Sequence, residues 1–306
     1  MKRKIIFSAV ALVFLSAIIL AALPSTHGIG QKVCLAANLV KNKAYAFTHP
    51  LPKGDFSGNG NQGYTGDGAG AERVAVLMYH YIAPKEYDDP NNNSIIALEA
   101  FEQGMDYLYR EGYYTASLSE LEDYVHGKIR LPEKTVVLTF DDGYENVYVY
   151  AYPILKKYGF RAAVFLIGNY VREEADGEFQ PDQMSFMSKE QIQAAGDVFE
   201  FHSHTFNLHY KKEEHCGKVY AATRDIPMLK EDIARMKSFG IDTPYFAYPF
   251  GDFNYRMVRQ LAGEGYRMAF TTIPGFVKPG DRPMYLKRFN VSSDTDLHAL
   301  LNGSWG

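Results

Sequence analysis

Mainly apolar runs alternate with amphipathic stretches along most of the chain. Val74–Tyr79 and Thr135–Phe140 are continuous runs of this kind, which are typical of strands buried on both faces of a parallel sheet. Between them, apolar side chains recur at helical spacing from Leu98 to Leu108. The same alternation predicts further strands over 114–117, 162–167, 198–202, 245–248 and 267–271, and further helices opening at Ser119, near 145–157, from 189, within 221–239 and over 255–263.

This order of elements predicts the fold class. Repeated strand–helix units form parallel sheets, and this many units in one domain favour a barrel over an open sheet. We therefore expect an α/β fold, namely a distorted (β/α) barrel of about seven strands. In such a fold the functional residues lie where the strands end.

The N-terminal part of the chain has a different pattern. A basic start at residues 2–4 precedes an almost uninterrupted apolar run over 5–23, which predicts a signal peptide or a membrane anchor over 1–24. Residues 25–72 include a glycine-rich stretch among small polar residues and predict a flexible stalk. Residues 73–306 are then expected to form a single catalytic domain. We expect this domain to lie outside the cytoplasm, either secreted or tethered to the outer face of the cell membrane.

Composition removes several classes of function. With 32 Lys and Arg against 36 Asp and Glu, the net charge of −4 gives no basic surface for nucleic acid, so we expect no nucleic-acid partner. The two cysteines, Cys34 and Cys216, are too few for a disulfide scaffold and form no thiolate metal motif. With 46% hydrophobic and 22% charged residues, the composition is otherwise that of an ordinary folded protein.

Two carboxylates follow one of the predicted strands. Asp141 and Asp142 come at the end of the run 135–140, immediately before Gly143, which lets the chain turn. Adjacent carboxylates resist joint ionisation unless a cation or hydrogen bonds compensate, so such pairs mark metal or acid–base sites. The alternative is a plain turn in which Asp141 caps the following helix.

A histidine cluster follows another predicted strand and favours the metal interpretation. His202, His204 and His209 lie at the end of the strand predicted over 198–202. Imidazole and carboxylate are normal ligands for zinc or a similar divalent ion, and two His with one Asp leave positions open for water and substrate. His202 shares a strand face with His204, where it either supports the ligands or merely fills space.

At these residues the chain resembles a known family, the polysaccharide deacetylases, which are carbohydrate esterases with the nodulation-type deacetylase domain. The resemblance covers the chain from about Val74 to the C-terminus. It rests on three motifs: Thr139–Gly143, Ser203–Thr205 with His209 following, and Tyr248–Gly251. It implies that the predicted catalytic domain is a polysaccharide deacetylase domain, which hydrolyses acetamide groups on a sugar polymer.

The resemblance also implies roles for individual residues. Asp141 is implied as the general base, and three residues are implied as ligands of a divalent metal: Asp142, His204 and His209. Zinc is the expected ion, with cobalt, nickel and iron as alternatives. The Tyr248–Gly251 motif implies an oxyanion and substrate-binding role for Phe250, through its backbone N–H, and for Tyr248.

One departure from the commonest family pattern concerns the histidines. His204 and His209 are five residues apart instead of four, which is similar to the branch that acts on poly-β-1,6-N-acetylglucosamine, a biofilm exopolysaccharide. That branch carries its catalytic acid in a Tyr-His pair after the first strand, which implies His80 as the acid here. His298 is the rival, because the commoner layout places the acid near the C-terminus. However, Asp296 is typical of a helix cap, which would leave His298 on a helix surface.

A second departure concerns the orientation of the base. The commonest pattern has an arginine two residues before the motif proline, where this chain has Ala247. Another cation must therefore orient Asp141, and Arg288 is the candidate.

Together these features predict metal-dependent N-deacetylation of an extracellular polysaccharide, with release of acetate. The expected partner is an N-acetylglucosamine polymer, foremost poly-β-1,6-N-acetylglucosamine, and the membrane is a second partner if the N-terminal segment is not cleaved. Two alternatives stay open at this point. One is a deacetylase of peptidoglycan or another N-acetylated glycan, and the other is a non-catalytic sugar-binding module on the same fold.

Overall fold

The computed structural model describes residues 70–304 apart from residues 90, 176, 215 and 216. The predicted signal or anchor segment over 1–24, almost all of the predicted stalk over 25–72 and both cysteines therefore lie outside the described residues. Among the residues that are described, no helix is long and apolar enough to cross a membrane.

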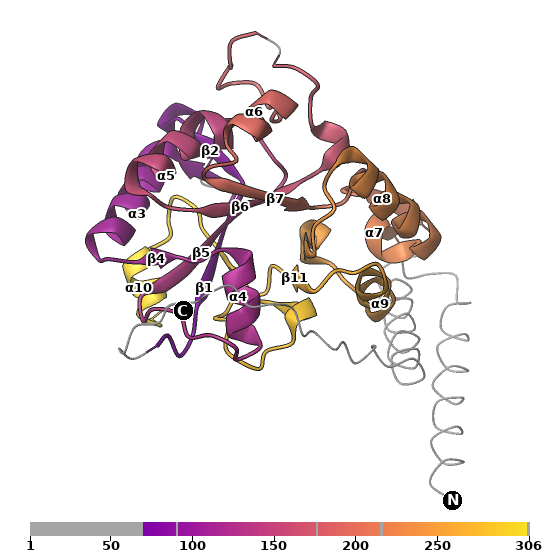
Figure 1. Cartoon of the computed structure of the whole chain (residues 1–306). Helices are drawn as coiled ribbons and strands as arrows, with labels where there is room; N and C mark the ends of the chain where they lie inside the picture. Colours follow the sequence, from indigo (N-terminus) through magenta and orange to yellow (C-terminus); the bar gives the residue numbers. More distant parts are fainter. Residues whose placement is uncertain (1–69, 90, 176, 215–216, 305–306) are drawn as a thin grey trace, which may run out of the picture.

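A parallel sheet of seven strands forms the centre of the molecule (Figure 1). Its strands follow the order β11-β10-β7-β6-β5-β1-β12, and the short strand β4 (Tyr114–Thr115) pairs with the start of β5. The seven strands are β1 (Ala75–Tyr79), β5 (Thr135–Phe140), β6 (Ala162–Leu166), β7 (Phe199–Ser203), β10 (Tyr245–Ala247), β11 (Met268–Phe270) and β12 (Phe289–Asn290).

The segment over residues 286–291 joins the two edges of this sheet. Leu286 exchanges backbone hydrogen bonds with β11 and the residue after it, since its N–H donates to Ala269 and its carbonyl accepts from Thr271. Three residues later, Phe289 lies in register with Leu77 of β1. The sheet is therefore curled into the distorted barrel that the alternation of elements predicts, and β12 is a strand that the sequence pattern did not reveal.

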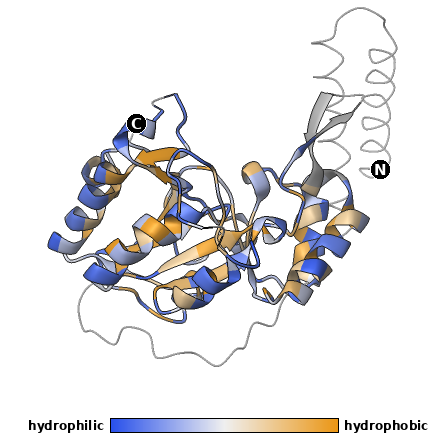
Figure 2. Cartoon of the chain, turned by 90° about the horizontal axis from the view of Figure 1, so that it is seen from above, coloured by the Kyte–Doolittle hydropathy of each residue, from blue (hydrophilic) through white to orange (hydrophobic). Residues whose placement is uncertain are grey.

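Two apolar layers stabilise the barrel because the strands are buried on both faces. Side chains such as Leu77 and Leu138 point outward and pack with Phe101 of the surrounding helices, whereas Val76 and Val137 belong to the inner cluster. Figure 2 shows the hydrophobic strands at the centre and helices whose hydrophilic faces turn outward. Burial of this apolar surface is the main favourable contribution to folding.

The helices surround the sheet, with α3 and α5 on one side and α8 and α9 on the other (Figure 1). They are α3 (Leu98–Arg110), α4 (Leu118–Val125), α5 (Tyr152–Tyr158), α6 (Lys189–Ala194), α7 (Ala221–Arg224), α8 (Ile226–Phe239), α9 (Tyr255–Gly263) and α10 (Leu297–Leu301). Two small sheets are separate from the barrel sheet: β2 (Tyr81–Ala83) pairs with β3 (Ile95–Ala97), and β8 (Lys211–Glu214) pairs with β9 (Gly217–Tyr220).

Helix boundaries differ from the predicted ones at two places. Ser117, and not Ser119, caps α4: its hydroxyl accepts the Glu120 N–H, and the Glu120 carboxylate accepts the Ser117 N–H in return. The helix predicted near 145–157 begins as a five-residue π turn over Val147–Ala151 before α5 continues it. Such wide turns are frequent near functional sites, and this one begins five residues after Asp142.

Candidate active site

The candidate residues meet at the carboxyl-terminal edge of the barrel, as expected for a parallel β/α fold. Asp141 and Asp142 follow β5, His204 follows β7, and His80 follows β1. The backbone at this edge is unusual. Asp142, Thr205 and Phe250 are the non-glycine residues with positive φ in the described part of the chain, at 71°, 74° and 59°. Conformations of this kind cost energy and cluster at functional sites.

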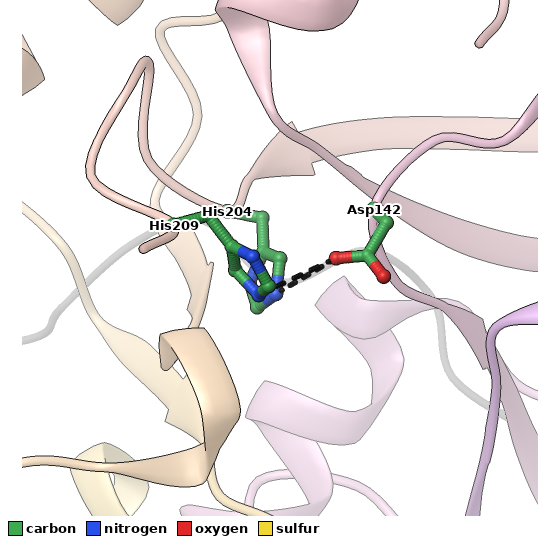
Figure 3. Close-up of side chains that lie close together, drawn as sticks. All are labelled: Asp142, His204 and His209. Atoms are coloured by element: carbon green, nitrogen blue, oxygen red, sulfur yellow. Dashed lines mark ion pairs between the residues drawn. The ribbon is translucent and has the colours of Figure 1, made fainter. Parts of the chain in front are cut away.

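Asp142, His204 and His209 point toward one another (Figure 3). The Nε2 atoms of His204 and His209 each lie 3.5 Å from Asp142 Oδ1, and one ligand atom of each residue lies within 4.8 Å of the others. His204 Nδ1 lies 2.8 Å from the Ala247 carbonyl oxygen. A carbonyl only accepts, so Nδ1 carries the proton and the Nε2 lone pair is left for a ligand.

The protonation states of these residues fit a divalent cation. Burial lowers the pKa of His204 to about 3 and also lowers the pKa of His209, so both imidazoles are neutral near pH 7. Burial and the neighbouring Asp141 charge raise the pKa of Asp142 to about 6, which leaves most of this carboxylate ionised near neutrality. Its buried Oδ1 accepts no hydrogen bond from any residue that the structure describes. A buried carboxylate oxygen that faces two neutral imidazoles is the donor set that zinc and similar ions take.

A helix outside the barrel holds the loop that carries the two histidines. The Asp232 carboxylate, on α8, accepts the backbone N–H groups of Phe206 and Asn207 at 2.6 and 2.7 Å. The Thr205 hydroxyl accepts a further N–H from Leu208. Sequence reasoning missed Asp232, because no motif marks a carboxylate in the middle of an amphipathic helix.

Arg288 binds Asp141 inside the barrel. Its two terminal nitrogens each lie 2.7 Å from one Asp141 oxygen, and its Nε donates to the Thr271 carbonyl. The Arg288 side chain is fully buried, against the faces of Phe165 and Phe270. Burial opposes ionisation of Asp141, but the Arg288 guanidinium outweighs it and holds the Asp141 pKa well below its usual range. The structure thus places the candidate cation on the candidate base, and Ala247, where the commonest pattern has arginine, supplies its carbonyl to His204.

The three other histidines that the sequence analysis singled out lie in different places. His80 is partly buried, and its Nε2 is 4.0 Å from Asp141 Oδ2. His298 is exposed on α10, which Asp296 caps, and its Nε2 contacts Asn302 in place of the site. His202 contacts Thr243 and Glu200 through its two ring nitrogens. It therefore packs away from the metal-binding cluster.

The Tyr248–Gly251 motif is only partly at the site. Tyr248 is fully buried, its hydroxyl donates to the Met284 carbonyl and its N–H donates to Phe270. The prediction that Tyr248 binds substrate is corrected accordingly, because the alternation of β10 turns its ring into the core. Phe250 lies beside the cluster, where its half-exposed ring stacks on His209 at a centroid distance of 4.1 Å.

Tyr144 is a site residue that sequence reasoning missed. Its hydroxyl interacts with the Asp142 carboxylate, and this interaction, together with burial, raises the Tyr144 pKa far above its ordinary value. Its position directly after Asp142–Gly143 was an available signal, because a turn at Gly143 brings the next side chain back over the carboxylate.

Comparison with known proteins identifies the family. A profile described as polysaccharide deacetylase matches residues 128–269. The structure of IcaB from Ammonifex degensii is 32% identical in sequence and aligns with a TM-score of 0.62, covering 74% of this chain and 94% of that one. The chain belongs to the polysaccharide deacetylase family. This deacetylase is also similar to YxkH of Bacillus subtilis, named as a polysaccharide deacetylase, with 29% identity over 72% of each chain. It is 26% identical to a Staphylococcus aureus poly-β-1,6-N-acetyl-D-glucosamine N-deacetylase, over 73% of this chain and 76% of that protein.

Family membership decides between the classes of function that the residues left open. This deacetylase is a hydrolytic enzyme, a polysaccharide N-deacetylase, and not a non-catalytic sugar-binding module. The family is generally metal-dependent, and Asp142, His204 and His209 offer the ion a site in this chain.

Proposed function

We propose that this deacetylase uses a divalent ion, held by Asp142, His204 and His209, to remove acetyl groups from poly-β-1,6-N-acetylglucosamine. The observation that carries this proposal is the buried Asp142 oxygen facing two neutral imidazole nitrogens, with the Asp141–Arg288 pair beside it. Similarity to the Staphylococcus aureus deacetylase, whose name states this polymer, supports the choice of substrate.

The ion supplies Lewis-acid polarisation of the acetyl carbonyl and a lowered pKa for a bound water. Zinc is proposed, because it suits two imidazoles and one carboxylate, with cobalt, nickel and iron as alternatives.

Asp141 is proposed as the base that accepts the proton of the attacking water. Its low pKa keeps the carboxylate ionised throughout the neutral range, so it is always in the state that accepts a proton. Arg288 donates a hydrogen bond to each Asp141 oxygen and thereby fixes the direction of the remaining lone pairs of the carboxylate. Rigid placement of this kind removes the entropy that orienting a base would otherwise cost.

His80 is proposed as the acid that protonates the departing sugar amine. Its Nε2 lies 4.0 Å from Asp141 Oδ2. The proton that Asp141 accepts from the water is therefore close to the imidazole that must donate one to the amine. The Phe250 backbone N–H is proposed to stabilise the oxyanion of the tetrahedral intermediate.

We also propose that the reaction takes place outside the cytoplasm. The basic residues 2–4 and the apolar run over 5–23 support export by a signal peptide or a membrane anchor. Each deacetylation converts a neutral acetamide into an amine that is partly cationic near pH 7. An exported enzyme would thereby give the polymer charge that binds it to anionic surfaces.

The proposed function is tested by acetate release from a β-1,6-linked N-acetylglucosamine pentamer, with and without chelator. Peptidoglycan and β-1,4-linked oligomers serve as comparison substrates. We expect chelator-sensitive release from the β-1,6 pentamer and little from the others. Release only from the comparison substrates would replace the proposed polymer, and release that survives complete metal removal would overturn the metal assignment.

A further inference from the structure

Three aromatic rings form a connected row that begins at the metal-binding cluster and ends at the surface. Tyr144, whose hydroxyl interacts with Asp142, stacks on Phe186 with centroids 5.1 Å apart. Phe186 in turn lies 4.6 Å from Tyr170, which is 39% exposed. We call Tyr144, Phe186 and Tyr170 the aromatic wall.

Backbone hydrogen bonds hold the wall in place from three loops. The segment carrying Phe186 runs antiparallel to the one carrying Tyr144, since the Glu145 N–H donates to Ser185 and the Met187 N–H donates to Gly143. The loop carrying Tyr170 is tied to the histidine loop on its other side, because the N–H groups of Gly168 and Asn169 donate to Thr205 and Phe206. The wall is therefore rigid relative to the metal-binding residues.

The position and chemistry of the wall fit a sugar ring. Tyr144 and Phe186 contact their neighbours in the row through their rings, so the surface left for a sugar is mainly the exposed ring of Tyr170. An aromatic ring is large, rigid and apolar, and it binds without losing much conformational entropy. The wall leads outward from Asp142 by two successive ring contacts, so a group bound on it lies beside the metal-binding cluster and not on it. Phe250, which stacks on His209, provides a second half-exposed ring beside the cluster.

We propose that the aromatic wall is a polymer subsite, which binds a sugar residue adjacent to the one being deacetylated. Tyr170 is its outermost contact and a determinant of preference for long chains. This inference rests on the proposed function in one respect, namely that the substrate is a chain of sugars. It requires neither a particular linkage nor a particular metal.

Substitution of Tyr170 tests the subsite. The substrates compared are the β-1,6-linked N-acetylglucosamine pentamer and the corresponding dimer. We expect Tyr170→Ala to lower kcat/KM on the pentamer by roughly threefold to tenfold, mainly through KM. On the dimer, we expect it to change kcat/KM less than twofold. Tyr170→Phe keeps the ring and should behave as the wild type. Tyr109→Ala is the matched control. Tyr109 is an exposed tyrosine on α3, and its ring also contacts another ring, that of Tyr158 on α5.

The subsite and the proposed polymer can fail separately. The proposed polymer is tested by whether the wild type acts on the β-1,6 or the β-1,4 linkage. The aromatic wall is tested by whether Tyr170→Ala lowers kcat/KM more on the pentamer than on the dimer. Calorimetric binding of the β-1,6 and β-1,4 pentamers to the Asp141→Asn/Arg288→Met double variant, with and without Tyr170→Ala, provides a readout that does not depend on turnover. The double variant lacks the base and leaves no unpaired buried charge. An equal loss on pentamer and dimer, or unchanged pentamer binding and turnover in Tyr170→Ala, would overturn the subsite.

Discussion

At the scale of single residues, the site depends on the replacement of one arginine by another. This chain lacks an arginine at Ala247, and Arg288 reaches Asp141 from the segment that closes the barrel. The two positions are far apart in sequence but both border the same edge, because residues 286–291 join β11 to β1. A fully buried guanidinium and carboxylate are each costly alone and tolerable only as a pair.

Removing Arg288 should therefore affect folding and turnover together. In Arg288→Met, Asp141 is left buried without its partner, and we expect a loss of about 3–5 kcal/mol in the free energy of unfolding. Chemical denaturation measures this loss. Adding Asp141→Asn to the same protein should recover much of the stability, because no unpaired charge then remains, but it should recover no deacetylation. If the double variant is no more stable than Arg288→Met, the pair does not carry the stability assigned to it.

The two rival histidines can be separated in one comparison. His80→Ala should lower kcat on the pentamer by about 10²–10⁴-fold, because a general acid contributes that much. His298→Ala should leave kcat within about twofold, since His298 is exposed on α10 and contacts Asn302. Measuring acetate release by both variants at saturating substrate decides the question. The reverse order of effects would make His298 the acid.

At the scale of elements, strand ends and helix faces were predictable because their signals are local. The apolar runs and the helical spacing located most strands and helices, and the strand ends located Asp141, Asp142 and His204. The short strand β12 was not predictable, because two residues carry no periodicity and their pairing depends on distant strands. The side-chain direction of Tyr248 was missed for a similar reason, since it depends on where β10 ends.

The opposite edge of the barrel has its own buried charge. α4 lies across the start of the strands, where Glu122 accepts hydrogen bonds from Arg267 at 2.7 and 2.9 Å and from the Tyr245 hydroxyl at 2.8 Å. Burial alone would raise the pKa of Glu122, but these hydrogen bonds outweigh it and hold the pKa below its ordinary value. Residues at this end of a β/α barrel usually contribute to stability and not to catalysis.

The lowered pKa gives Glu122 a pH-dependent role in stability. A carboxyl whose folded pKa lies below its unfolded value stabilises the protein above the unfolded pKa, and this contribution is lost as the pH falls through the folded pKa. We expect Glu122→Gln to be less stable than the wild type by about 1–2 kcal/mol at pH 7, with the difference shrinking below about pH 4.5. Denaturation at several pH values measures this, with the exposed Glu102→Gln as control. A difference that is independent of pH would contradict the assigned role.

At the scale of the whole molecule, the metal-binding cluster joins parts of the barrel that are separate in sequence. Asp142 follows β5, whereas His204 and His209 follow β7, with β6 between them in the sheet. Without a cation, a buried carboxylate oxygen faces two imidazoles and has no hydrogen-bond donor among the described residues. Binding of an ion to these three residues should therefore stabilise the folded chain as well as support its chemistry.

Thermal unfolding of the full chain with and without chelator tests this linkage directly. A ligand that binds only the folded state at 100 to 1,000 times its Kd adds about 3–4 kcal/mol, which corresponds to a rise in Tm of about 5–15 °C for a domain of this size. We expect chelator to lower the Tm by that amount and added zinc to restore it. Asp142→Asn should have a Tm that neither treatment changes, because the variant lacks the charged ligand, whereas His298→Ala should respond as the wild type does. An Asp142→Asn protein that still responds to chelator would mean that the stabilising ion binds elsewhere, and the three-residue site would then have to be abandoned.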